Sequence, residues 1–296
     1  MQCIFCHKDS SGSKSKEHII PESLGNKEHF LPIGYVCDEC NHYFAVKIEK
    51  PLLSLNYFKG IRARNHILTK KDKIAEQTFF FPQVVDTSEI ADVTTPKGKV
   101  LIIDNPDVYN GIINGKINTM YVPYYPEPDY PDLILSRFLA KCAYEYFLYH
   151  VKPDKYESCA KELLSEQTDV LKPLREYARF GKGPLWQYNQ RMIYQEGSIF
   201  YNAVEKLSYE ILHEMTMFTN EHTIPKEGLV EAEIYFVVAI GGIEYAICIS
   251  DPDISGYRDW LVNNNNRSPL KEEYETINPC GLSDNKSSFD NNKEYN

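Results

Sequence analysis

The sequence lacks the two features that would direct a chain into or across a membrane. No stretch of its 296 residues approaches the length and purity of an apolar membrane span. The first residues, Met1-Gln2-Cys3, do not form an apolar signal region. We therefore expect no membrane partner and a cytoplasmic location. The eight cysteines suit that compartment if four bind a metal and the others stay reduced, namely Cys142, Cys159, Cys248 and Cys280.

The chain also lacks an overall excess of basic residues. Its formal net charge is −10, which on its face argues against a nucleic-acid partner. The distribution is uneven, because residues 1–76 hold twelve Lys and Arg against nine Asp and Glu, and the remainder holds twenty against thirty-three. A local positive stripe can contact phosphates on an acidic protein, although a solvated linker is an equal alternative. The residues expected to contact phosphate in this stripe are Lys59, Arg62, Arg64, Lys70 and Lys71.

No catalytic motif is recognisable between residues 130 and 262. The pair His213-Glu214 lies in a strand-like apolar run, where a half-buried strand histidine is the simpler explanation. Three arginines recur in an aromatic-rich stretch, and pairing with the many acids is favoured over an anion site: Arg175, Arg179 and Arg191. The chemistry is therefore expected in the first part of the chain.

Four cysteines form two Cys-x-x-Cys pairs at the start of the chain: Cys3 with Cys6, and Cys37 with Cys40. Two such pairs have the spacing of a tetrahedral structural Zn²⁺ site. His7 and His42 flank the pairs and are alternative ligands, but four thiolates already complete the coordination. The segment between the pairs is longer than a minimal zinc ribbon, so it has to contain further structure.

That segment holds an acid–histidine pair, Glu17-His18-Ile19-Ile20-Pro21, and Asn41 follows the last cysteine directly. An imidazole titrates near neutrality and can take a proton from water. A carboxylate and an amide oxygen are hard ligands that suit Mg²⁺. Hydrolysis of a phosphodiester needs both an activated water and a cation.

Taken together, these motifs resemble an HNH endonuclease of the zinc-stapled kind over about residues 1–58. The resemblance also includes Leu24-Gly25-Asn26 and Val36 before the second cysteine pair. It implies a ββα-metal fold, in which a two-stranded hairpin carries His18 and a helix packs across it. It further implies that His18 is the general base, that Glu17 and Asn41 hold a catalytic Mg²⁺ or Mn²⁺, and that the substrate is DNA. His42 is then placed to touch a substrate phosphate.

The segment departs from the family pattern at two positions. Pro32 stands where the family usually has a middle asparagine, and Glu17 stands where Asp is commoner. Asn26 and His29 are nearby candidates for orienting His18, although neither is in register. The simpler alternatives are a zinc knuckle without catalysis, a His18 hydrogen-bonded inside the hairpin, and an Asn41 that caps or decorates the helix.

The pattern of the whole chain predicts an α+β protein: a zinc-stapled ββα-metal module followed by a larger α+β domain. We expect the module over 1–58, a basic junction over 59–77, the accessory domain over 78–262, and a polar, Asn-rich mobile tail over 263–296. Strands are expected at 4–5, 17–20, 33–36, 78–81, 98–103, 119–125, 208–218, 229–240 and 243–250. Helices are expected from Asp38 to before Pro51 and at 51–58, 132–150, 155–164, 170–180 and 257–262. Gly241-Gly242 indicates a hairpin.

The function expected from these observations is metal-dependent DNA endonuclease activity. The alternative is a zinc-ribbon protein that binds nucleic acid or regulates without hydrolysis. A third arrangement makes residues 78–262 an inhibitory or ligand-gated domain. Proteins with an HNH module before an α+β partner resemble effectors of bacterial genome defence or mobile-element nucleases, so a homodimer, a partner protein and an activating ligand on the accessory domain all stay open.

Overall fold

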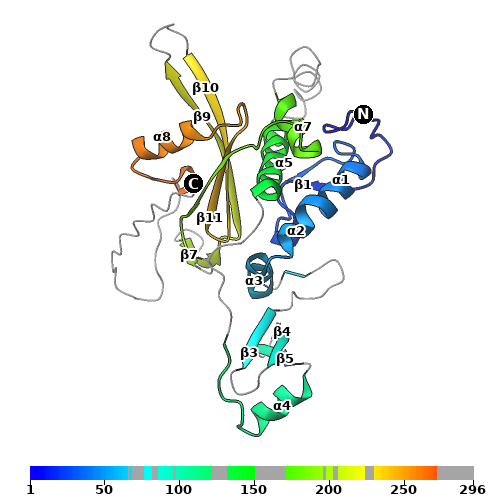
Figure 1. Ribbon diagram of the computed structural model, residues 1–296, viewed down its shortest axis with the longest axis vertical. Coiled ribbons are helices and arrows are strands. Elements are labelled where there is room, and N and C mark those ends of the chain that lie inside the picture. The colour runs from blue at the N-terminus through cyan, green and yellow to red at the C-terminus, as the bar shows by residue number, and fades with distance from the viewer. Residues whose placement is uncertain are drawn as a thin grey trace.

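A computed structural model describes residues 1–65, 67–68, 77–81, 86–95, 98–103, 105–121, 132–150, 171–195, 198–202, 206–223 and 230–271. The fold is mixed α+β, with an N-terminal region that carries the four cysteines and a larger region built on an antiparallel sheet, as Figure 1 shows. Among the helices described, none is both long and apolar enough to cross a membrane.

The N-terminal region consists of one short hairpin and a helical arm. β1 (Glu17–His18) pairs antiparallel with β2 (Phe30–Leu31), and η1 (Glu22–Leu24) lies in the loop between them. The expected second strand at 33–36 is wrong, because those residues form turns and Gly34 has a φ of 93°. Strands this short are fixed by the packing around them rather than by their own pattern.

The helical arm runs without a break through α1 (Asp38–Phe44), the π-helical segment η2 (Ala45–Glu49) and α2 (Lys50–Leu53). The predicted start at Asp38 is confirmed. The predicted end before Pro51 is wrong, because Pro51 occupies the first turn of α2, where its missing N–H costs nothing.

α3 (Asn56–Arg64) continues into the stretch expected to be a basic junction. The predicted helix at 51–58 therefore has the wrong bounds. The Tyr57 hydroxyl donates to the carbonyls of Ile240 and Gly241, both at 3.1 Å, and Ile61 is buried. The first part of the expected junction is thus a helix bound to the turn of a distant hairpin.

A small antiparallel meander follows, with strands in the order β3 (Gln77–Phe81), β4 (Asp86–Thr95) and β5 (Gly98–Ile103). Figure 1 shows it at one end of the molecule with α4 (Pro106–Ile113). The strands expected at 78–81 and 98–103 are confirmed, whereas β4 and α4 were not predicted. The strand expected at 119–125 is not formed at 119–120, and residues 122–125 lie outside the described ranges.

α5 (Asp132–His150) lies between the N-terminal region and the large sheet (Figure 1), and the predicted helix is confirmed. It is buried on nearly all sides, because apolar residues cover most of its circumference. α7 (Lys172–Phe180) packs against it and ends at Gly181, whose φ of 65° closes the helix in a left-handed cap. The helix expected at 155–164 lies outside the described residues.

The large sheet has the strand order β6 (Tyr188–Met192), β11 (Ile243–Cys248), β10 (Val230–Ile240) and β9 (His213–Thr223), all antiparallel. Alternate residues of β10 face two cores. Phe236 and Val238 belong to the core shared with α5, while Tyr235 and Val237 belong to the core covered by α8 (Ser255–Asn263). The Gly241-Gly242 hairpin is confirmed.

Two further differences concern the ends of predicted elements. The strand expected at 208–218 is two strands, because β8 (Leu207–Glu210) pairs with β7 (Ile199–Asn202) and β9 begins at His213. The polar tail expected from residue 263 is structured to residue 271 by η3 (Pro269–Lys271) and by Ser268, whose hydroxyl donates to the buried Glu244 carboxylate. Residues 272–296 lie outside the described ranges.

Candidate active site and zinc centre

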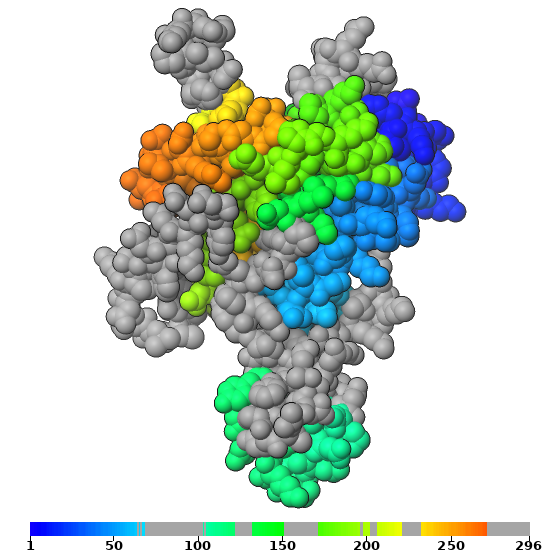
Figure 2. Space-filling view, in the orientation of Figure 1, coloured from blue at the N-terminus to red at the C-terminus, as the bar shows by residue number. Residues whose placement is uncertain are grey.

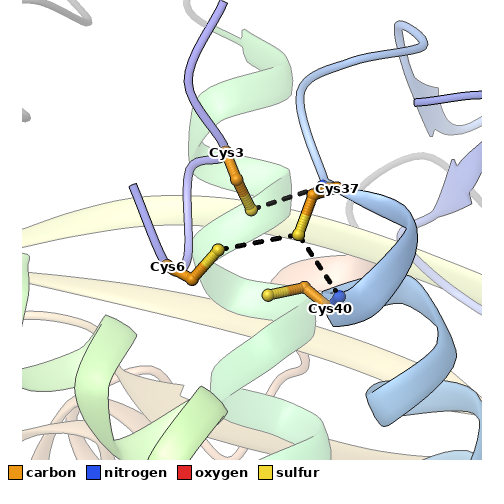
Figure 3. A group of neighbouring side chains, drawn as sticks. All are labelled: Cys3, Cys6, Cys37 and Cys40. Atoms are coloured by element: carbon orange, nitrogen blue, oxygen red, sulfur yellow. Dashed lines mark hydrogen bonds between the residues drawn. The ribbon is translucent and has the colours of Figure 1, made fainter. Parts of the chain in front are cut away.

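The four cysteine side chains converge on one point between an N-terminal turn and α1 (Figure 3). All four Sγ atoms lie within 4.8 Å of one another, and the Sγ atoms of Cys6 and Cys37 are 3.6 Å apart. A tetrahedral Zn²⁺ with Zn–S bonds of about 2.3 Å separates its sulfur ligands by about 3.8 Å. The cluster therefore fits structural Zn²⁺, and the metal-binding group found among the described residues includes neither His7 nor His42.

Hydrogen-bond donors surround these sulfurs. The backbone N–H of Cys37 donates to Cys3 Sγ at 3.3 Å, and that of Cys40 donates to Cys37 Sγ at 3.4 Å. The Arg179 Nε atom, from α7, donates to Cys40 Sγ at 3.2 Å. Such donors stabilise thiolates. The side-chain hydrogen bond from Cys40 lowers the pKa of Cys3 to about 4 and raises the pKa of Cys40, so without a cation the cluster shares protons.

Glu17 and Asn41, the two residues expected to hold the catalytic cation, meet between β1 and α1. The Asn41 Nδ2 atom donates to Glu17 Oε2 at 2.8 Å and to the Lys16 carbonyl at 3.1 Å. Glu17 is buried, with 4% of its surface exposed. The suggestion that Asn41 caps the helix is wrong, because the cap of α1 is Cys37.

This pair fits a small hard cation. A half-turn of the Asn41 amide exchanges its nitrogen and oxygen positions, which places two oxygens about 2.8 Å apart. Neighbouring ligands of an octahedral Mg²⁺ with bonds of about 2.1 Å are separated by about 3 Å. With the amide turned in this way, which gives up the hydrogen bond to the Lys16 carbonyl, Glu17 and Asn41 would hold one cation between them.

His18 follows Glu17 on β1, and the two side chains point to opposite faces of the strand. Its ring centroid lies 5.8 Å from that of Phe30, the residue opposite it in β2. Burial lowers the pKa of His18 from 6.5, against the opposing effect of the Glu22 carboxylate. The imidazole is therefore neutral at pH 7. Its Nδ1 atom is buried and has no hydrogen-bond partner among the described residues. The ring does form a hydrogen bond with the backbone of Asn26 in the hairpin loop, which partly opposes the lowering of the pKa.

Asn26 holds the loop that connects the two strands of the hairpin. It is fully buried, and its Nδ2 atom donates to the carbonyls of Ile20 and His29 at 2.7 and 2.8 Å. Its Oδ1 atom accepts from the backbone N–H groups of Glu28 and His29. The Asn26 side chain therefore fixes the backbone next to His18, while the Asn26 backbone forms a hydrogen bond with the His18 ring.

The sequence analysis missed Lys141, a fully buried lysine of α5. Its Nζ atom lies 2.7 Å from Glu17 Oε1 and 3.1 Å from a carboxylate oxygen of both Glu49 and Glu145. The same atom donates to the His18 carbonyl at 3.0 Å. The Glu17 carboxylate is thus held between Lys141 on one oxygen and Asn41 on the other.

The charges in this cluster influence one another strongly. Burial alone would lower the pKa of Lys141, but the Glu145, Glu17 and Glu49 carboxylates raise it well above its usual value, so the ammonium stays charged. Burial raises the pKa of Glu17 and that of Glu145. The Lys141 ammonium opposes this rise, and the neighbouring carboxylates add to it.

Two more residues of α5 bind the backbone of the N-terminal region. The Cys142 thiol donates to the Ile19 carbonyl at 3.0 Å, and the Tyr144 hydroxyl donates to the Ile4 carbonyl at 3.1 Å. Figure 2 shows the blue N-terminal residues adjoining the green residues of the second region. A sequence signal for this arrangement exists, since a helix that is apolar on nearly all sides has to be buried, together with any charge it carries.

The residues expected to contact DNA phosphates do not lie on one element: one is on α1, three are on α3, and two lie outside the described residues. His42 is exposed on α1, and Lys59 is half-buried on α3. Arg62 is also half-buried, its Nε atom has no hydrogen-bond partner among the described residues, and burial lowers its pKa. Arg64 lies in α3, whereas Lys70 and Lys71 are outside the described residues.

Comparison with known families supports the resemblance seen in the sequence. Residues 3–54 match a family model described as HNH endonuclease, and this HNH region holds a four-cysteine cluster consistent with structural Zn²⁺. No curated protein and no solved structure gives a significant match to the chain. The matched segment is under a fifth of the chain and ends before α5, which supplies Lys141.

Proposed function

We propose that the protein is a metal-dependent endonuclease that hydrolyses phosphodiester bonds of DNA. The observation that carries this proposal is the contact between Glu17 and Asn41, within a segment that matches the HNH endonuclease family. A carboxylate and an amide from different elements meet there. His18, the next residue on the strand, points to the opposite face, and its pKa is lowered by burial.

His18 is the proposed general base. Its Nδ1 atom is buried, so Nε2 is the nitrogen that receives the proton of the attacking water. A base has to be unprotonated at the working pH, and the lowered pKa of His18 meets that requirement. Asn26 keeps the His18 backbone in place through the loop that follows it.

Glu17 and Asn41 are the proposed ligands of Mg²⁺ or Mn²⁺. When bound there, the cation supplies positive charge to the scissile phosphate. His42 and the basic residues 59–71 are proposed to contact the DNA backbone, which fixes position without reading sequence. A cytoplasmic location and a role in bacterial genome defence or a mobile element rest on the resemblance and on the composition alone.

Cleavage of supercoiled plasmid by wild type and by His18→Ala, with Mg²⁺, Mn²⁺ or no added divalent cation, tests this function. We expect metal-dependent nicking or linearisation that falls by at least about 100-fold in the variant, the usual contribution of a general base. His150→Ala, at an exposed position at the end of α5, is the matched control and should cleave as wild type does. Equal cleavage by His18→Ala and wild type would disprove the mechanism.

One observation favours a second candidate, a zinc-stabilised protein that binds DNA without hydrolysing it. The Glu17 carboxylate is already paired with the Lys141 ammonium, so it has less need of a cation. This candidate predicts salt-dependent DNA binding that survives substitution of Glu17, His18 and Asn41 together, with no cleavage in any metal.

A further inference from the structure

Four charged side chains form one buried cluster behind the proposed cation site: Glu17, Glu49, Glu145 and Lys141, which we call the Lys141 cluster. Two members come from the matched HNH segment and two from α5. The side chains of Lys141 and Glu145 are fully buried, and those of Glu17 and Glu49 are 5% and 15% exposed. With all groups ionised, the cluster holds three negative charges and one positive charge.

Such an imbalance is unfavourable in a buried site, because charges removed from water need partners nearby. Lys141 is the cation found near these carboxylates in the described structure, and it is shared by all three. Both carboxylate oxygens of Glu145 lack a hydrogen-bond donor among the described residues, so the ion pair with Lys141 is the contact that balances Glu145. With all four groups ionised, two negative charges are left over; without a divalent cation, proton uptake by Glu17 or Glu145, whose pKa burial raises, would relieve that excess.

We propose that the Lys141 cluster sets the affinity of the nuclease site for its divalent cation: Lys141 balances one carboxylate, and the cation held by Glu17 and Asn41 balances the other two. This inference rests on the proposed function. It makes α5, which lies outside the matched segment, part of the metal site. Lys141, Glu49 and Glu145 are then positioning residues, because they act on the cation through Glu17.

The geometry lets both cations be present together. Lys141 contacts Glu17 Oε1, while Asn41 contacts Glu17 Oε2, so the ammonium and the divalent cation use different oxygens. The ammonium is also tied to the His18 carbonyl, which fixes it on its own side of the carboxylate. Lys141 therefore orients Glu17 without occupying the position next to Asn41.

The test is Mn²⁺ binding by full-length, zinc-loaded protein, measured by calorimetry in buffer without chelator. Glu145→Gln removes one negative charge, keeps the shape of the side chain and touches neither Asn41 nor His18. We expect the Mn²⁺ dissociation constant to rise on the order of tenfold, because the charge lies within a few ångströms of Glu17 in a poorly solvated site. The thermal midpoint of unfolding without Mn²⁺ should be unchanged or higher, because a negative charge in excess has been removed.

Glu49→Gln provides a second variant at a less buried position and should weaken Mn²⁺ binding in the same direction. Glu176→Gln is the matched control, since Glu176 pairs with Lys182 on α7 and lies outside the cluster, so its dissociation constant should equal that of wild type. A purely structural ion pair predicts the reverse pattern. In that case both cluster variants unfold at a lower temperature and bind Mn²⁺ as wild type does, which would overturn the proposal while leaving the proposed function intact.

Glu17→Ala distinguishes a failure of the proposed metal site from a failure of the proposed charge balance. Loss of Mn²⁺ binding in Glu17→Ala, together with weakened binding in Glu145→Gln, supports both the metal site and its charge balance. Wild-type binding by Glu17→Ala, or no binding by wild type, overturns the proposed function and this inference together.

Discussion

At the scale of single residues, one buried ammonium joins parts of the chain that are distant in sequence. Lys141 contacts carboxylates on β1, on η2 and on its own helix, and it also binds the backbone of the hairpin. Arg179 acts in a similar way at the other metal site, since it donates to Cys40 and its guanidinium lies 3.8 Å from the Tyr43 ring centroid. The second region thus places Arg179 against the cysteine cluster and Lys141 against the proposed ligand Glu17.

Removal of the buried ammonium should be costly. We expect Lys141→Met, which keeps most of the side-chain volume, to lower the free energy of unfolding by about 3–5 kcal/mol, because three carboxylates lose their shared partner. Chemical denaturation at pH 7 measures this. Lys182→Met, which removes a surface ion pair with Glu176, should change stability by less than about 1 kcal/mol. Similar small losses in both variants would contradict the view of Lys141 as the centre of the cluster.

The lowered pKa of His18 predicts the pH dependence of cleavage. Because burial favours the neutral imidazole, the base stays active below its ordinary pKa of 6.5 and is lost as the pH falls through the lowered value. The acid limb of the cleavage profile should therefore have its midpoint below 6.5. Zinc release is followed in the same samples, since protonation of the thiolates also weakens Zn²⁺ binding. A midpoint above 6.5, with zinc retained, would contradict the geometry described for His18.

Several site residues could be predicted because their chemistry has a short-range signature. The cysteine pairs, Glu17 and Asn41 stand at characteristic spacings, and the structure brings each set together. Lys141 has no such signature, because its partners are set by how a helix from the second region docks. Asn26 was noticed as a polar neighbour of His18, but its role depends on four backbone contacts that appear only in the folded loop.

At the scale of elements, α3 connects the N-terminal region to the large sheet. The Tyr57 hydroxyl donates to two carbonyls at the turn between β10 and β11, so a residue near the nuclease module and a turn far along the chain share one contact. The stretch expected to be a basic linker therefore begins as a docked helix. Lys59 and Arg62 lie on a helix that is partly covered, which limits how much of their charge reaches a DNA backbone.

Loss of the Tyr57 hydroxyl tests this docking. We expect Tyr57→Phe to lower the free energy of unfolding by about 1 kcal/mol, because two buried carbonyls lose a donor. Tyr109→Phe, at an exposed position on α4, is the matched control and should leave stability unchanged. Equal stability of wild type and Tyr57→Phe in a denaturant titration would argue that α3 docks through its apolar face alone.

Elements with strong patterns were predictable and those set by context were not. The two glycines between β10 and β11 and the apolar run of α5 mark a hairpin and a helix on their own. β4 begins with Asp86, Thr87 and Ser88, which resemble a loop and form a strand through their pairing with β3. The π-helical turn of η2 carries Glu49 to Lys141, and local sequence gives no sign of it.

At the scale of the whole molecule, the N-terminal HNH region and α5 share one hydrophobic core. Phe5 contacts both Phe44 and Tyr144 in it, with its ring centroid 4.6 Å from that of Phe44 and 5.2 Å from that of Tyr144. A segment as short as the matched one has little apolar interior of its own. The domain boundary expected near residue 58 is therefore not a boundary in packing.

An isolated fragment of residues 1–76 should not behave as an independent nuclease. Without α5 it exposes apolar residues that the full chain buries, so we expect poor dispersion of its amide resonances, dye binding and no cleavage, even with Zn²⁺ present. Co-expression with residues 77–296 should restore soluble material that contains both parts. A well-folded, active fragment would show that the module is self-sufficient and that α5 is a later addition to its surface.

Because the core is shared, the N-terminal region cannot complete its packing until α5 has been synthesised. Roughly a hundred residues separate Asn41 from Lys141, which a ribosome adding about 5–20 residues per second needs about 5–20 s to produce. Throughout that interval the nascent chain has every proposed catalytic side chain but lacks the helix that supports them. If the fragment of residues 1–76 is inactive, as we expect, the proposed activity would arise only after translation has passed α5.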